Sequence, residues 1–156
     1  MSIPARPLHL RPQLLARGVS SDEVQRARRA GELVSVRRGA YLGRGDERLD
    51  VPAARHEVLV RATLPTLAPG TVVSHVSAAV LHGLAVWGIP LDHVHVTRPE
   101  RTSGRLGSVL HRHVAPLDPT EVVLIGGIPV TSLPRTVVDL ARTVPFEHAV
   151  VIADSA

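Results

Sequence analysis

The sequence contains no cysteine, no lysine and only three aromatic side chains among its 156 residues. The absence of cysteine excludes a disulfide scaffold, thiol chemistry and thiolate-bound zinc or iron–sulfur sites, so that histidine and carboxylate groups are the remaining metal ligands. Three aromatic side chains (Tyr41, Trp87 and Phe146) are too few to favour stacking on single-stranded nucleic acid. The 44% of hydrophobic residues, mostly Val, Leu, Ile and Ala, suffices for the core of one ordinary domain or two small ones.

Long apolar runs are missing as well. No stretch approaches the roughly 18 consecutive apolar residues of a membrane-spanning helix. The first residues, MSIPARPLHLRPQ, lack the apolar run of a secretory signal. These absences predict a cytoplasmic protein that has no membrane partner.

Positive charge is concentrated in the N-terminal part of the chain. Residues 1–62 carry twelve Arg against seven acidic residues, whereas residues 63–156 carry six Arg against seven acidic residues. Residues 1–44 contain nine Arg and only three acidic residues. Such a distribution is typical of a surface that binds phosphate groups. An ordinary solvated surface has the same composition, and the charge alone does not separate the two interpretations.

Two consecutive helices are predicted near the N-terminus. The first spans residues 11–18, with a proline in its first turn and a glycine at its end. The second begins after Ser20, because Ser20 and Glu23 have the spacing of a capping box, in which the hydroxyl and the carboxylate each satisfy a backbone N–H. It runs to about Ala30, where Gly31 favours the left-handed conformation that commonly ends a helix.

The second helix has an apolar side and a basic side. At 100° per residue, Val24, Ala27 and Ala30 share one side. The outward side carries amide and guanidinium groups, those of Gln25, Arg26, Arg28 and Arg29. Such a helix can enter the major groove, where arginine pairs with guanine edges or phosphate and glutamine with adenine edges. A solvated helix face is the structural alternative.

A basic hairpin follows this helix pair. Residues 33–36 alternate as a strand does, Arg37-Arg38-Gly39 forms a tight turn, and residues 40–42 return. A basic wing beside a helix-turn-helix reaches the backbone or the minor groove of the same duplex. We therefore predict a winged helix-turn-helix over residues 1–45 that binds double-stranded DNA through Gln25, Arg26, Arg28, Arg29, Arg37 and Arg38. The alternative is a degenerate winged helix that makes protein contacts.

Residues 46–156 are predicted to form a mixed α/β module. Helices are expected at residues 50–63, at 75–82 after Ser74 as cap, after Ser132 as cap through residue 141, and from about residue 146. Strands are expected at residues 94–97, 108–113, 122–125 and 128–131, the last two joined by a Gly126-Gly127 hairpin turn. The order of helices, then strands, then helices favours an α+β fold over an alternating parallel sheet.

The nine histidines offer a different chemistry. His93 and His95 share one face of a strand, as do His111 and His113, so two adjacent strands could present four imidazoles to a metal ion. No carboxylate joins them at the spacing of a metal enzyme, and no HExxH or HxE signature occurs. We therefore favour exposed or hydrogen-bonded strand histidines and expect neither a metal nor a cofactor.

Two further features have a structural and a functional interpretation. Arg135 and Asp139 stand four residues apart on an expected helix, which predicts an ion pair rather than part of a nuclease or partner-binding site. A restriction-type nuclease needs clustered acids and usually a lysine, which this chain lacks, so no enzymatic activity is expected. Residues 97–105 carry three arginines and are interpreted as a plain loop rather than as auxiliary phosphate contacts.

Four segments, in the same order, resemble one protein family. They are LLARGV at residues 14–19 with AGELVSVRRGAY at 30–41, SHVSAAVLHGL at 74–84, VHVTRP at 94–99, and IPVTSLPRTVVDLA at 128–141. Together they resemble actinobacterial proteins related to the AbiEi antitoxins of type IV toxin–antitoxin systems. The resemblance covers nearly the whole chain. It implies a DNA-binding N-terminal domain, autoregulation of an operon, and a second domain that antagonises a nucleotidyltransferase toxin.

The chain departs from this family pattern at both ends. Residues 1–8 contain two prolines and are too short for the helix that normally precedes the helix-turn-helix, so the winged helix is expected to lack it. Many relatives continue into a nuclease-like domain similar to very-short-patch repair endonucleases, and the chain stops at Ala156 within an expected helix. The domain at residues 46–156 is therefore expected to be truncated.

The sequence thus predicts a transcriptional regulator or antitoxin-like protein that represses its own operon. One alternative is a protein-interaction module that neutralises a nucleotidyltransferase toxin. The other is the targeting half of a truncated nuclease.

Overall fold

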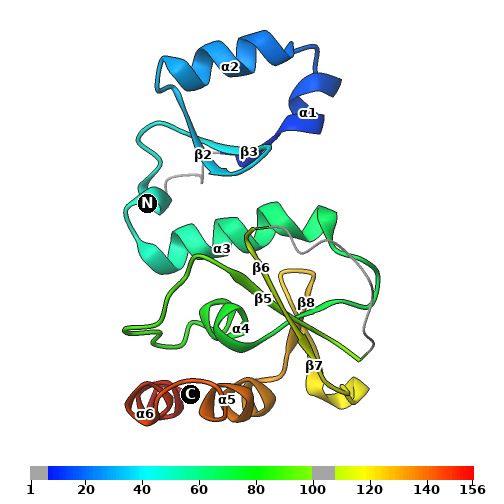
Figure 1. The fold of residues 1–156 in the computed structure, drawn as a ribbon, viewed down its shortest axis with the longest axis vertical. Helices are drawn as coiled ribbons and strands as arrows, with labels where there is room; N and C mark the ends of the chain where they lie inside the picture. Colours follow the sequence, from blue (N-terminus) through cyan, green and yellow to red (C-terminus); the bar gives the residue numbers. More distant parts are fainter. Residues whose placement is uncertain (1–6, 100–107) are drawn as a thin grey trace. The chain divides into compact units, whose positions relative to one another are not determined.

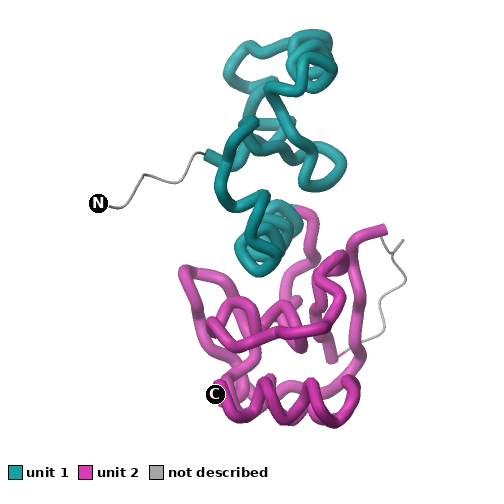
Figure 2. Tube along the Cα trace, turned by 90° about the vertical axis from the view of Figure 1, so that its left-hand side faces the viewer, with its two compact units in different colours: residues 1–65 teal, residues 66–156 magenta. Residues whose placement is uncertain are grey.

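The computed structural model describes residues 7–99 and 108–156 and is a mixed α+β structure. The chain divides into two compact units, residues 1–65 and 66–156 (Figure 2). The boundary lies later than residue 45, where the expected DNA-binding domain ends, because the helix at residues 52–63 contacts the second strand of the N-terminal hairpin sheet. Each unit is described separately below.

The first unit combines helices with a small antiparallel sheet (Figure 1). Its elements are β1 (His9–Leu10), α1 (Arg11–Ala16), α2 (Ser21–Arg29), β2 (Leu33–Arg37), β3 (Ala40–Gly43), the short 3-10 helix η1 (Glu47–Leu49) and α3 (Pro52–Thr63), followed by η2 (Leu64–Thr66) at the boundary. The strands are ordered β1-β3-β2. The expected helices and hairpin are confirmed, whereas β1 was not predicted because two residues show no alternation.

Local signals explain the helix pair. The Glu23 backbone N–H donates to Ser20 Oγ at 3.2 Å, and the Ser20 backbone N–H donates to the Glu23 carboxylate at 2.7 Å. The predicted capping box is therefore confirmed. Gly18 and Gly31 adopt φ values of +86° and +71° where the two helices end. Glycine adopts such positive φ values with less strain than other residues, because it has no Cβ atom.

The helix pair and the hairpin are tied to each other. The Arg11 backbone N–H donates to the Gly39 carbonyl at 2.8 Å, which fixes the start of α1 against the hairpin turn. The Arg11 guanidinium donates to Ser21 Oγ at 3.0 Å at the start of α2. Val24 of α2 is buried, as are three consecutive residues of β3, Ala40 to Leu42. The two helices and the hairpin thus form one packed assembly.

The second unit contains a five-stranded mixed sheet (Figure 1). Its elements are β4 (Val72–Val73), α4 (His75–Leu81), β5 (Val94–Arg98), β6 (Leu110–Val114), η3 (Pro119–Glu121), β7 (Val122–Ile125), β8 (Ile128–Thr131), α5 (Leu133–Ala141) and α6 (Phe146–Asp154). The strand order is β6-β5-β4-β8-β7, which places β6 and β7 at the edges. The β5/β6 and β4/β8 pairs are parallel, whereas β4/β5 and β7/β8 are antiparallel.

The helices of this unit share a core. α4 contacts β5, β8 and α5, and α5 in turn contacts α6. The buried side chains of this cluster are those of Val76, Ala79, Leu84, Leu140 and Ile152. Because Val76 and Ala79 are three residues apart on α4, they lie on the same side of that helix. This core holds α4, and with it the residues at the start of α4, against the sheet.

In this unit, the predicted hairpin turn is confirmed, whereas the two predicted serine caps are not. Gly126 and Gly127 adopt φ values of +55° and +79°, as a two-residue hairpin turn requires, and the hairpin is confirmed. Ser74 and Ser132 do stand at the N-caps of α4 and α5, but neither side chain makes a capping hydrogen bond. The prediction was wrong for Ser74 because its Oγ accepts instead from Thr97 Oγ1 at 2.7 Å.

The pair of Arg135 and Asp139 is confirmed and is part of a larger group. Arg135 Nε donates to Asp139 Oδ1 at 2.9 Å, and Arg135 Nη1 donates to Glu121 Oε2 at 2.7 Å. The Arg135 and Asp139 side chains are only 14% and 8% exposed. The guanidinium thus joins α5 to the residue that precedes β7.

Two expectations concern residues outside the described ranges. The arginine-bearing segment 97–105 falls largely on residues 100–107, and the expected lack of an additional N-terminal helix falls largely on residues 1–6. None of the helices described has the length and apolar character needed to cross a membrane.

Candidate functional site

The basic side of α2 is the first candidate site. Val24 is the buried residue of this helix, and it anchors the apolar side. All four residues assigned to the outward side are exposed: Gln25, Arg26, Arg28 and Arg29. The last turn of the helix therefore presents three guanidinium groups to solvent within four residues. Such a surface can bind phosphate oxygens or base edges.

Two of these side chains are already oriented by their neighbours. Arg28 Nη1 donates to Gln25 Oε1 at 3.2 Å, and the Arg28 guanidinium lies 5.7 Å from the centre of the Tyr41 ring. A cation over a ring face is attracted by the ring quadrupole. Arg28 thereby connects the basic side of α2 to the buried tyrosine of β3. For Gln25, a contact to an adenine edge would replace this internal hydrogen bond.

The two arginines of the hairpin turn have different surroundings. Arg38 is exposed, as expected for a wing residue. Arg37 is half-buried, and its Nη1 donates to the Ala62 carbonyl at 3.0 Å near the end of α3. A cation there also interacts favourably with the helix dipole. The structure thus places Arg37 between the hairpin and α3, a contact across 25 positions of the sequence that no local pattern indicated.

Arg17 and Arg44 are among the exposed arginines of the same unit that the motif did not assign. Arg17 follows α1, and Arg44 follows β3. Both belong to the nine arginines of residues 1–44. In the sequence, only the high number of arginines in residues 1–44 pointed to these two residues.

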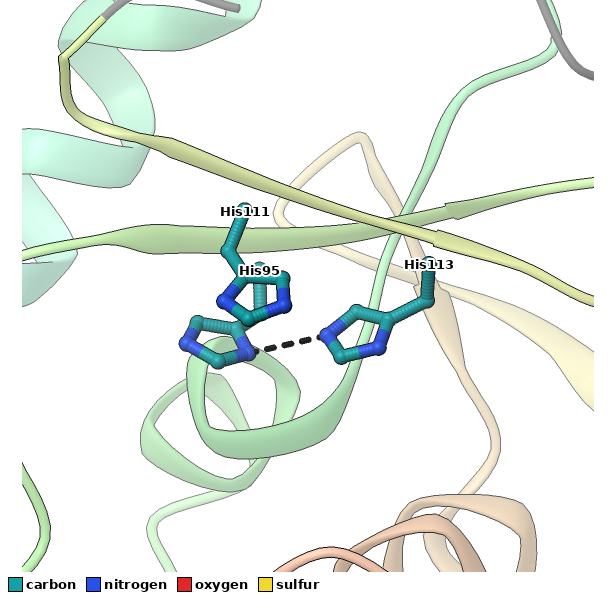
Figure 3. Close-up of side chains that lie close together, drawn as sticks. All are labelled: His95, His111 and His113. Carbon is teal, nitrogen blue, oxygen red and sulfur yellow. Dashed lines mark hydrogen bonds between the residues drawn. The ribbon is translucent and has the colours of Figure 1, made fainter.

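A histidine cluster in the second unit is the second candidate site (Figure 3). The parallel register of β5 and β6 places His95 beside His111 and Thr97 beside His113. His95 Nδ1 and His113 Nε2 share a hydrogen bond of 3.0 Å. The centre of the His111 ring lies 4.6 Å from that of each of the other two rings. Three of the four histidines paired by sequence spacing are therefore brought together.

The fourth of these histidines does not join the group. His93 precedes β5, and its Nδ1 lies 3.0 Å from Asp92 Oδ2. The Asp92 side chain is largely exposed, and the His93 side chain is partly exposed. His93 was predicted to share a strand face with His95. This prediction was wrong because β5 begins only at Val94, so that His93 lies outside the strand.

His75 contributes a ring that the sequence did not indicate. It is the first residue of α4, and its ring stacks on that of His113 with a centroid distance of 3.4 Å and an interplanar angle of 10°. Its Nδ1 lies 3.0 Å from Ser74 Oγ. Its φ of +51° is the only positive value at a non-glycine position among the described residues. Strained conformations of this kind cost about 1–3 kcal/mol and cluster at functional sites.

Burial sets the protonation of this cluster. Desolvation, followed by the neighbouring imidazoles, lowers the pKa of His75 to about 3. Desolvation, followed by the charge of His111, lowers the pKa of His113 to about 4. Both rings are therefore neutral at neutral pH, and each neutral imidazole has one nitrogen lone pair.

The four rings line one pocket of about 730 Å³. Its remaining wall is mainly apolar and includes Ile89, Leu140 and Val144. A pocket of this volume, with a few polar groups on an apolar wall, is typical of a small-ligand site.

No family model matches the sequence. No curated protein matches it either.

Proposed function

We propose that this protein is a DNA-binding transcriptional regulator of the AbiEi antitoxin-like type, which represses its own operon through a winged helix in residues 1–65. The observation that carries the proposal is the exposed arginine-rich side of α2, on a capped helix that is packed directly against a hairpin. The proposed mechanism is occupancy of an operator rather than chemistry.

The dimensions of α2 suit a DNA groove. An α-helix with its side chains is about 10–12 Å in diameter, and the nine residues of α2 make it about 13 Å long. The major groove of B-DNA is about 12 Å wide and admits one α-helix. Because α2 is anchored through Val24, its opposite side is available over its full length.

The proposed contacts divide into two kinds. Gln25 and Arg29, opposite the anchored side, are assigned to base edges. Arg26, Arg28 and Arg38 are assigned to phosphate groups, which fix position without reading sequence. Arg37 is assigned a positioning role, since its guanidinium binds the Ala62 carbonyl and orients the hairpin that carries Arg38.

A specific observation favours one second candidate function, neutralisation of a nucleotidyltransferase toxin by the second unit. Trp87 and Phe146 are 69% and 79% exposed in that unit. Exposed large apolar side chains are more typical of protein contacts than of DNA contacts. Six arginines against seven acids also make residues 66–156 a poor surface for DNA.

The test is a titration of the whole chain against the DNA upstream of its gene and against a scrambled duplex of equal length, at two salt concentrations. We expect tighter binding to the upstream duplex, with a slope of log K against log salt of roughly −0.9 for each phosphate contact. Arg29→Ala should weaken the preference for the upstream duplex, whereas Arg142→Ala, an exposed arginine of the second unit, should change neither affinity nor preference.

Equal and weak binding to both duplexes would overturn the proposed regulator. Co-purification of the chain with a nucleotidyltransferase toxin, in the absence of DNA binding, would then establish the second candidate.

A further inference from the structure

The three histidines of β5 and β6 have no role in the proposed DNA contacts, and they lie in the other unit. Their ring nitrogens, one from each residue, all lie within 4.8 Å of one another. We propose that His95, His111 and His113 form a site for one divalent transition-metal ion, with zinc as the probe. The proposal does not depend on the DNA-binding function.

The distances require little rearrangement. Two imidazole nitrogens bound to one tetrahedral zinc at about 2.0–2.1 Å lie about 3.3 Å apart. The separation of His95 Nδ1 and His113 Nε2 is 3.0 Å, and the His111 nitrogen falls within the 4.8 Å limit of the group. The three rings are nearly parallel, with interplanar angles of 7–29°, so they must rotate about their side-chain bonds for their lone pairs to meet at one ion. The strands themselves need not move, because the parallel register already aligns His95 with His111.

The donor set selects the kind of ion. Imidazole nitrogen suits zinc, copper, nickel and cobalt, whereas magnesium and calcium prefer carboxylate and carbonyl oxygen. The acidic side chain that lines the same pocket, Asp92, lies 3.0 Å from His93 rather than among the three rings. A three-nitrogen set of this kind is the one found where zinc keeps a fourth position open.

The surroundings support the ligands and define the open position. His75 stacks on His113 at 3.4 Å and restricts the orientation of that ring, as outer-shell partners of metal ligands commonly do. All three proposed ligands line the 730 Å³ pocket, so the fourth coordination position faces this pocket. A water molecule or a small anionic ligand would complete the coordination there.

A purely structural role explains the cluster less well. His111 is exposed, and an exposed strand position can hold many polar residues. Its ring nevertheless stacks on His95 and on His113 rather than extending into solvent. A shared ligand accounts for the gathering of the three rings at one point.

The experiment is a zinc titration of the whole chain, purified without a histidine tag and stripped with a chelator, against a competing zinc indicator. We expect one zinc per chain with a Kd below about 1 μM. His111→Asn should weaken binding by at least about tenfold, since loss of an outer-shell partner alone typically costs 10–100-fold. His93→Asn is the matched control, because His93 lines the same pocket outside the three-ring group, and it should stay within twofold.

Two further readouts fix the interpretation. Cobalt bound in place of zinc should give the visible spectrum of a four- or five-coordinate site, and His111→Asn should abolish that spectrum. Because His111 is exposed, this variant should keep the circular dichroism spectrum of the parent chain. Binding weaker than about 100 μM, or an equal loss in His111→Asn and His93→Asn, would overturn the proposal.

Discussion

Arg135 carries more of the stability of the second unit than an ordinary helix ion pair would. Its guanidinium contacts both Asp139 and Glu121. Asp139 is buried, with 6% of the surface of the whole residue exposed. A surface pair at the same i, i+4 spacing contributes about 0.3–0.5 kcal/mol. Removal of one partner of a buried pair costs far more, because the other charge is left without compensation.

We therefore expect Arg135→Ala to lower the free energy of unfolding by roughly 3 kcal/mol. The matched control is Arg61→Ala, because Arg61 and Glu57 form an i, i+4 pair whose side chains are 43% and 44% exposed. That control should cost at most about 0.5 kcal/mol. Urea unfolding curves of the whole chain measure both values. Equal costs for the two variants would show that the Arg135 group behaves as a surface pair.

At the scale of elements, the capping box determines where α2 begins. Hydrogen bonds from the backbone N–H and then the hydroxyl of Ser20 lower the pKa of Glu23 below its ordinary value of 4.5. A carboxyl whose pKa is lower in the folded state stabilises the fold above its unfolded pKa, and this contribution is lost as the pH falls through the folded value. The capping box is thus strongest at neutral pH and weakens below about pH 4.5.

Ser20→Ala should destabilise the first unit by about 1 kcal/mol at pH 7, and the loss should be smaller at pH 3. The control is Ser132→Ala, because Ser132 occupies the N-cap of α5 without a side-chain hydrogen bond and should cost little. Urea unfolding curves of the whole chain, followed by circular dichroism at both pH values, measure both variants. A Ser20→Ala loss that is the same at both pH values would contradict the role assigned to Glu23.

The elements that the sequence predicted correctly have signals within a few residues. The capping box at Ser20, the stop at Gly31 and the Gly126-Gly127 turn each involve neighbouring positions, whose geometry is nearly independent of the rest of the fold. β1 and β4 have two residues each and show no periodicity.

Features that depend on distant partners were not predictable. Arg37 contacts Ala62, and Ser74 contacts Thr97, because of tertiary packing. His75 joins the cluster through a left-handed backbone conformation that is uncommon for residues other than glycine. The candidate DNA residues of α2 could be located from helical periodicity, and strand alternation indicated His95, His111 and His113. The contact between His75 and His113 could not be located in this way, because it depends on tertiary packing.

At the scale of the whole molecule, charge is divided unequally between the two units. Residues 1–65 hold twelve arginines against seven acids, and residues 66–156 hold six against seven. Long-range attraction of DNA depends on the total charge, whereas counterion release depends on the arginines that contact phosphate. The two contributions can be separated with variants of equal net charge.

The contact variant replaces the three proposed phosphate contacts, Arg26, Arg28 and Arg38, by Gln. The control replaces Arg55, Arg61 and Arg142 by Gln, and all six are exposed. Both triple variants lose the same charge. We expect the salt slope of DNA binding to become shallower by up to about 2.7 in the contact variant, since three phosphate contacts at 0.9 each would be lost. The slope should be unchanged in the control. Equal slopes in the two variants would mean that only total charge matters.

The parallel register of β5 and β6 also has a consequence for folding. Side chains alternate along a strand, so a slip of one residue would turn His111 and His113 to the opposite face and bring Arg112 toward His95. Pairing of β5 with β6 requires the chain between them to close a loop before any contact compensates for the lost entropy. The ring cluster therefore assembles only when this pairing is complete, which makes it a marker of a correctly registered edge strand.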